Sequence, residues 1–147
     1  MPSAADYAVA RAILEPSLFS LFEAQHPRDI VHSARTAQWL IERNQDDPEL
    51  LAAALLHDIG KGEQRRSDRV IYVLASELRV ADLVGNGRSR YAVRRAVARS
   101  RVHSERGAVL LERAGASERV VALTRLHHSE AGRDGILRLL QAADAAS

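Results

Sequence analysis

Five histidines and two aspartates are the residues with which this sequence could do chemistry. His57 and Asp58 stand side by side at the end of the apolar run "AALLHDIGKG". The others are spread along the chain and are His32, His103, His127, His128 and Asp144. Imidazole and carboxylate groups together suit divalent ions such as manganese, iron, magnesium, cobalt, nickel or zinc. Because the sequence contains no cysteine, a metal site would have to use these nitrogen and oxygen ligands.

The positions of these residues, at the ends or last turns of predicted helices, favour a shared site. Taken singly, a buried histidine is more often a satisfied core residue than a metal ligand. As a set, the residues are hard to explain by packing, because burying Asp58 and Asp144 without a cation would be costly. An antiparallel pairing of successive helices also brings His32 beside His57. We therefore expect five of the residues to lie close together in the fold: His32, His57, Asp58, His127 and Asp144.

The elements that must position these side chains are predicted to be helices. Apolar residues recur at helical spacing, and strand-like alternation is almost absent. Asp47 and Asp134 are predicted helix caps, and Gly60 is predicted to end the helix that carries His57. The segment 69–84 could also form a short strand, because valine, isoleucine and tyrosine suit strands. The predicted helices cover 6–25 in two pieces that meet at Pro16, then 27–44, 48–59, 69–84, 89–101, 104–114, 117–129 and 135–146.

Length and composition indicate a single domain. A chain of 147 residues with 46% hydrophobic content can form one core and leaves little room for a second. No internal repeat, low-complexity tract or long linker interrupts it. We expect one all-α domain over residues 1–147, a compact bundle of seven or eight helices. Its core would span about residues 28–146, preceded by a helical segment at 4–25.

Charge and hydropathy limit the partners of this chain. Asp6 and Arg11 stand where a signal peptide would need an unbroken apolar stretch, and no later run has membrane-spanning length. We therefore expect a soluble, cytoplasmic protein with no membrane partner. The net charge of +2 is mild and does not indicate a nucleic-acid-binding composition. The oligomeric state is left open by the sequence.

Two strings and their order resemble a known family. The pair His57-Asp58 in "LLHDIGKG" lies between His32 and the terminal Asp144 in "LQAAD". This order resembles the HD superfamily of metal-dependent phosphohydrolases, of the HDIG type, over about residues 28–146. The additional histidines in "VHSERGAVLLERAG" and "LHHSE" look like those of two-metal members, which include HD-GYP phosphodiesterases and HD-type diadenosine tetraphosphate hydrolases. The GYP element is missing, because "EAGRDG" follows the histidine pair, which argues against a cyclic di-GMP phosphodiesterase.

The resemblance implies a role for each ligand. In HD enzymes metal ions activate a water molecule that attacks phosphorus. Asp58 would bridge two ions and is therefore also a catalytic residue. His32, His57 and Asp144 would complete the coordination of the first ion. His103 and His127 would complete the coordination of the second ion. His128 could be a further ligand, a contact to the substrate or a residue that supports another ligand.

Basic residues near the proposed site are candidates for binding phosphate. Lys61 is the only lysine among 21 basic residues and directly follows the string His-Asp-Ile-Gly. It could be a catalytic and substrate-binding point charge, or equally a solvated loop residue. Seven arginines between residues 88 and 106 lead into His103. Arg94 and Arg101 are predicted to bind substrate phosphate, although this stretch could also be an ordinary exposed helix face.

Three functions are compatible with these observations. The first is a phosphohydrolase acting on a small phosphorylated substrate such as a nucleotide. The second is an oxygenase, because some HD proteins use a di-iron pair with the same ligand order to activate dioxygen. The third is a non-catalytic module that binds a nucleotide or a nucleic acid. A full ligand set argues against the third, because a binding scaffold has no evident need for a costly buried cluster.

Overall fold

The protein is helical throughout its described residues. The computed structural model describes residues 1–61 and 88–147, and of residues 88–100 it describes the backbone and Ala98 alone. Within these ranges there are seven α-helices, one 3-10 helix and no strand, which confirms the predicted all-α class. The predicted helix at 69–84 lies outside the described residues. The helices are α1 (Ala4–Ile13), α2 (Pro16–Glu23), α3 (Pro27–Ile41), α4 (Pro48–Leu56), η1 (Ile59–Lys61), α6 (Arg88–Arg113), α7 (Glu118–Leu126) and α8 (Gly135–Ala146).

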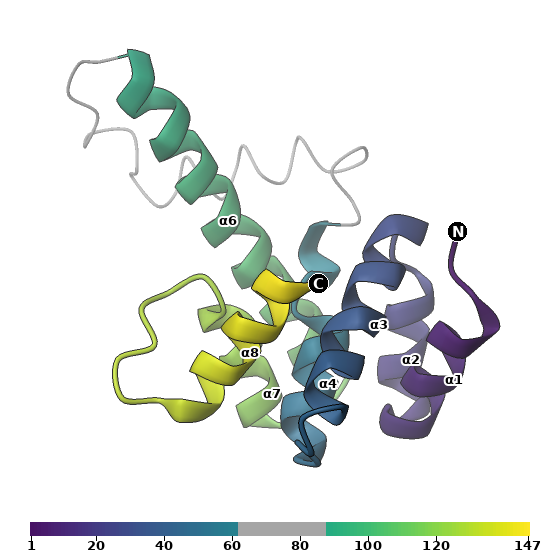
Figure 1. Ribbon diagram of the computed structural model, residues 1–147. Coiled ribbons are helices and arrows are strands. Elements are labelled where there is room, and N and C mark those ends of the chain that lie inside the picture. The colour runs from purple at the N-terminus through teal and green to yellow at the C-terminus, as the bar shows by residue number, and fades with distance from the viewer. Residues whose placement is uncertain (62–87) are drawn as a thin grey trace.

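Helix α4 is the centre of the bundle. Every residue from Leu50 to Leu56 is buried. A helix that is apolar on all sides is stable in water only when other elements surround it. Helices α1, α2, α3, α7 and α8 all pack against it, with α7 and α8 on the opposite side from α1 and α2 (Figure 1). The end of α4 is therefore held from several directions, and this end carries His57 and Asp58.

The N-terminal helices α1 and α2 pack onto this bundle. Helix α1 begins with a capping box between Ser3 and Asp6. Pro16 lies in the first turn of α2, so the predicted division of residues 6–25 into two helices is confirmed. Phe22 is completely buried, and the ring of Tyr7 meets it edge-on with ring centres 6.2 Å apart. These helices thus extend the hydrophobic core beyond α3 and α4.

Two predicted helix caps are confirmed and the role predicted for Gly60 is wrong. Asp47 accepts hydrogen bonds from backbone amides in the first turn of α4, and Asp134 does the same for α8. Helix α4 ends at Leu56, with His57 as its C-terminal cap, before Gly60 is reached. Gly60 instead lies buried inside η1, where its lack of a side chain permits a close contact described below.

Helix α6 is one continuous helix, so the predicted helices at 89–101 and 104–114 are a single element. No proline interrupts the stretch, and each further residue of a helix adds a hydrogen bond once the helix has started. Ser104 is buried within α6 and does not begin a new helix. His103 consequently lies in the middle of a helix and not at an end. The first turns of α6 extend beyond the other helices (Figure 1).

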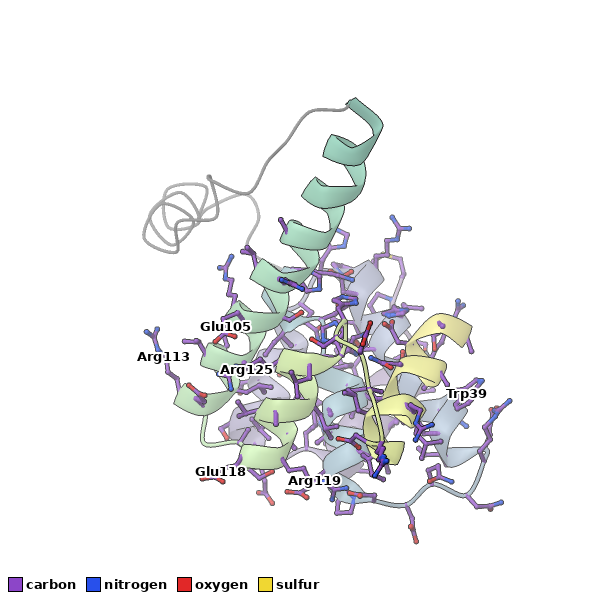
Figure 2. All side chains as sticks on the ribbon, turned by 90° about the vertical axis from the view of Figure 1, so that its left-hand side faces the viewer. Trp39, Glu105, Arg113, Glu118, Arg119 and Arg125 are labelled. Carbon is purple, nitrogen blue, oxygen red and sulfur yellow. The ribbon has the colours of Figure 1, made fainter. Side chains whose placement is uncertain are left out.

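Ion pairs tie α7 to its neighbours. Arg125 on α7 contacts Glu105 at 3.0 Å and Glu112 at 2.9 Å, both on α6. Figure 2 shows Arg125 beside Glu105 where these two helices pack. At the other end of α7, Arg119 contacts Asp47 and Glu49. Such exposed pairs contribute at most about 1 kcal/mol each, so they set orientation more than stability.

No helix within the described part of the chain is both long and apolar enough to cross a membrane. The most hydrophobic helix, α4, has only nine residues and is enclosed by the bundle. A bilayer-spanning helix needs about 20 residues.

Candidate metal centre

The structure brings the seven predicted ligand residues together. Two groups of side chains share Asp58, and the ligand atoms within each group lie within 4.8 Å of one another. One group adds His32 and His57, and Asp144 joins it through contacts to both histidines at 2.9 and 3.3 Å. The other group adds His103, His127 and His128. Residues from five different helices or helix ends therefore meet at one place.

The carboxylate of Asp58 separates these two groups. Its Oδ2 atom lies 3.7 Å from Nε2 of His32 and 3.5 Å from Nε2 of His57. Its Oδ1 atom lies 3.6 Å from Nε2 of His103 and 3.8 Å from Nε2 of His127. Each oxygen thus faces its own pair of imidazoles, and only 2% of the side chain is exposed. We call the two regions the Oδ2 side and the Oδ1 side.

His57 and His127 are oriented in the same way by the helices that they cap. The Nδ1 atom of His57 lies 2.9 Å from the carbonyl oxygen of Ala54, and that of His127 lies 2.6 Å from the carbonyl oxygen of Thr124. A carbonyl can only accept, so Nδ1 carries the proton in both rings. A neutral ring then presents the lone pair of Nε2 toward Asp58. Histidine ligands of metals are commonly fixed by such a second hydrogen bond.

Gln141 on α8, which the sequence analysis did not identify, forms hydrogen bonds with the turn that follows α7. Gln141 donates from Nε2 to the carbonyl oxygens of His127 and Ser129, at 3.1 and 2.6 Å. This turn also carries His128, whose Nε2 lies 3.0 Å from Nε2 of His103. The spacing in the sequence could have indicated Gln141, because it lies three positions before Asp144 and therefore on the same face of α8.

The electrostatics of the two carboxylates favour their charged forms. Burial raises the pKa of Asp58, but the charges of His57 and Lys61 and the hydrogen bond from Lys61 outweigh it, so the pKa is lowered overall. Burial also raises the pKa of Asp144, but hydrogen bonds with His32 and His57 lower it well below the usual range. Both aspartates therefore remain anionic, which is the form that binds cations.

The two capping histidines differ in their protonation. Burial lowers the pKa of His57, but the hydrogen bond with Asp144 and the charge of Asp58 outweigh it, and the pKa is raised. Burial and the neighbouring charge of His57 lower the pKa of His127 to about 3. His127 is thus neutral near pH 7, as a metal ligand must be.

Two orphaned atoms fit a cation on the Oδ1 side. Oδ1 of Asp58 and Nε2 of His127 are buried and have no hydrogen-bond partner among the described residues. A buried polar atom without a partner costs about 1–3 kcal/mol. Both are electron-pair donors, so they cannot satisfy each other, whereas one cation between them would satisfy both. With the imidazole and carboxylate groups around it, the site fits a divalent ion.

The basic residues have different positions relative to this centre. Lys61 donates from Nζ to Oδ2 of Asp58 at 2.5 Å, and 39% of its side chain is exposed. Lys61 is therefore at the edge of the centre, where it can also reach solvent. Arg101 is exposed on α6, two residues before His103. The side chain of Arg94 lies outside the described residues, so its proposed contact with phosphate stays a prediction.

A helical bundle that gathers histidines and aspartates around one buried, shared carboxylate defines a class of protein able to hold metal ions. The family model described as HD domain matches residues 25–147, and the chain belongs to this family. The resemblance expected from the sequence is thereby confirmed. HD domain proteins are in general metal-dependent phosphohydrolases. Comparisons with curated proteins and with solved structures gave no match.

Proposed function

We propose that this protein is a metal-dependent phosphohydrolase that acts on a nucleotide or a related small phosphate ester or anhydride. The observation that carries the proposal is the position of Asp58, whose two oxygens face separate pairs of imidazoles. In this proposal Asp58 would be shared by two divalent cations. The Oδ2 side would hold one with His32, His57 and Asp144, and the Oδ1 side the other with His103, His127 and His128.

Bound divalent ions would supply Lewis acidity, which lowers the pKa of a water molecule and neutralises phosphoryl oxygens. The chain itself fixes the donors. The carbonyls of Ala54 and Thr124 hold the rings of His57 and His127 with Nε2 toward Asp58. Because these two rings and Asp58 are almost completely buried, little reorganisation is needed when a substrate binds. In this proposal the donor atoms are held in place before a substrate binds.

The substrate would be recognised through its phosphate. Lys61 is the basic group best placed for this role, because its ammonium group contacts the centre and is still partly exposed. An ammonium group binds phosphate as a point charge. Arg101 and Arg94 on α6 would add positive charge around an anionic substrate. A nucleotide fits this recognition, since its charge lies in the phosphates that must approach the centre.

The test combines metal analysis with a substrate screen. The purified protein is analysed for bound metals, and phosphate release is measured from nucleotides and simple phosphate esters with each of the six candidate ions. We expect the Asp58→Asn substitution to lower kcat/KM by at least about 100-fold, because it removes the shared charge. Asp46→Asn, a matched change at an exposed aspartate, should leave activity unchanged.

Two results would contradict hydrolysis. Turnover that requires dioxygen and releases no phosphate would indicate the oxygenase instead. Tight nucleotide binding that survives Asp58→Asn, without turnover under any ion, would indicate a binding module. Running the screen both with and without oxygen distinguishes these outcomes.

A further inference from the structure

The 3-10 helix η1 and helix α6 meet backbone to backbone. A Cβ atom added to Gly60 would overlap the carbonyl oxygen of His103 and lie 2.9 Å from the amide nitrogen of Gly107. A Cβ atom on Gly107 would in turn lie 3.4 Å from the amide nitrogen of Gly60 and 3.3 Å from Cγ2 of Thr124. Two glycines therefore face each other across this contact, and only the position of Gly60 has no room for any side chain.

This contact joins the two sides of the metal centre. Gly60 follows Asp58 by two residues, and its neighbour across the contact is the backbone of His103 itself. Helix α6 packs mainly on α7 and η1. The other residues of the Oδ2 side come from α3, α8 and the end of α4, none of which is α6. The approach of α6 to η1 thus sets the 3.6 Å distance between Oδ1 of Asp58 and Nε2 of His103.

We infer that Gly60 is a positioning residue for the Oδ1 side: its missing side chain lets α6 come close enough for His103 to share a cation with Asp58. The inference rests on the proposed function, in which two cations bind. A methyl group at position 60 would push α6 away by roughly 1 Å, because its carbon would lie 1.9 Å from the carbonyl oxygen of His103 and real Cβ contacts essentially never fall below 3.0 Å. Metal-ligand distances tolerate only about 0.2 Å. The Oδ1 side would therefore bind its cation more weakly, while the Oδ2 side binds its own normally.

The experiment measures metal binding and does not depend on activity. Manganese alone is titrated into the metal-free protein by calorimetry, for the wild type and three glycine-to-alanine variants. Gly60→Ala should bind one ion normally and the second about 10- to 100-fold more weakly. Gly107→Ala, whose added carbon meets neighbours at 3.3–3.5 Å, should weaken the same ion measurably but by less than about 10-fold. Gly135→Ala, where the added carbon meets nothing within 4 Å, should bind both ions normally.

Selectivity is the decisive result. Equal weakening of both ions in Gly60→Ala would indicate a general structural role and overturn the inference, as would two ions bound with unchanged affinity. If circular dichroism shows that Gly60→Ala does not fold, Gly107→Ala takes its place as the test. Weaker binding of only one of the two ions in Gly107→Ala would support the inference, whereas unchanged binding of both ions, or equal weakening of both, would overturn it. A wild type that binds only one ion would contradict the proposed pair of cations, and the inference with it, before any variant is compared.

Discussion

The Oδ1 atom of Asp144 lies 3.3 Å from Nε2 of His57, although the two residues are 87 positions apart in the chain. Because Nδ1 of His57 donates to Ala54, a neutral ring points a lone pair at this carboxylate. Two acceptors at that distance repel unless a proton or a cation lies between them. Burial lowers the pKa of His57, but the hydrogen bond with Asp144 outweighs burial, so the pKa is raised overall. The raised pKa means that the folded protein favours a proton between these two atoms. Metal binding and proton release are therefore expected to be linked at the Oδ2 side.

Removal of divalent ions should lower the melting temperature. An ion present at 100 times its Kd stabilises the folded state by about 2.7 kcal/mol. For a domain of this size that corresponds to roughly 5–10 °C. We expect manganese to raise the melting temperature of the chelated wild type by this amount in differential scanning calorimetry. In Asp58→Asn the shift should nearly vanish, and an equal shift in both proteins would show that the ion binds elsewhere.

The substitution Gln141→Glu should destabilise the turn after α7. The carboxylate of glutamate cannot donate, so the carbonyls of His127 and Ser129 would lose their partner and face a negative charge. We expect a loss of about 1–3 kcal/mol in the free energy of unfolding, measured with urea. Gln45→Glu is the matched control, because the Gln45 side chain donates to Arg43 in an exposed turn. Equal losses in the two variants would contradict a special role for Gln141.

The sequence predicted what local signals determine. Aspartates before Pro48 and before Gly135 are capping residues, and both helices begin where these signals place them. Five of the seven residues, His32, His57, Asp58, His127 and Asp144, stood out because burying carboxylates without a cation is costly, whereas His103 and His128 were predicted as ligands only through the resemblance to the HD superfamily. Local signals thus account for most of the fold, and the cost of burying charge together with the resemblance accounts for the residues predicted for the site.

The rest depended on tertiary contacts. The continuity of α6 through Ser104 was missed, because serine often caps a helix but is also tolerated inside one that packs along its length. Gly60 was taken for a helix end, since glycine commonly serves as one, and its true neighbour lies 43 residues away at His103. Nor does the sequence reveal which oxygen of Asp58 faces which imidazole. Each of these features is decided by the approach of elements that are distant in the chain.

The lowered pKa of His127 predicts how the chelated protein responds to acid. Burial and the charge of His57 lower this pKa from 6.5 to about 3. The unfolded chain therefore binds a proton between these pH values and the folded protein does not, so stability is full above pH 6.5 and falls as the pH decreases toward 3. The raised pKa of His57 acts in the opposite direction, adding stability as the pH falls. Asp58 and Asp144, whose pKa values are lowered overall, lose their contribution only below about pH 4.

A comparison of variants isolates the contribution of His127. Urea unfolding is measured with chelator present at pH 6.5, 5.5 and 4.5, for the wild type, His127→Gln and His26→Gln. Glutamine does not titrate, so His127→Gln should lose less stability over this range than the wild type, by about 1 kcal/mol or more for each pH unit. His26 is exposed at the start of α3 and outside the centre, where its Nδ1 accepts from the amide of Arg28, and His26→Gln serves as the control for the loss of a histidine elsewhere. Parallel losses in all three proteins would show that the folded protein protonates His127 as readily as the unfolded chain does.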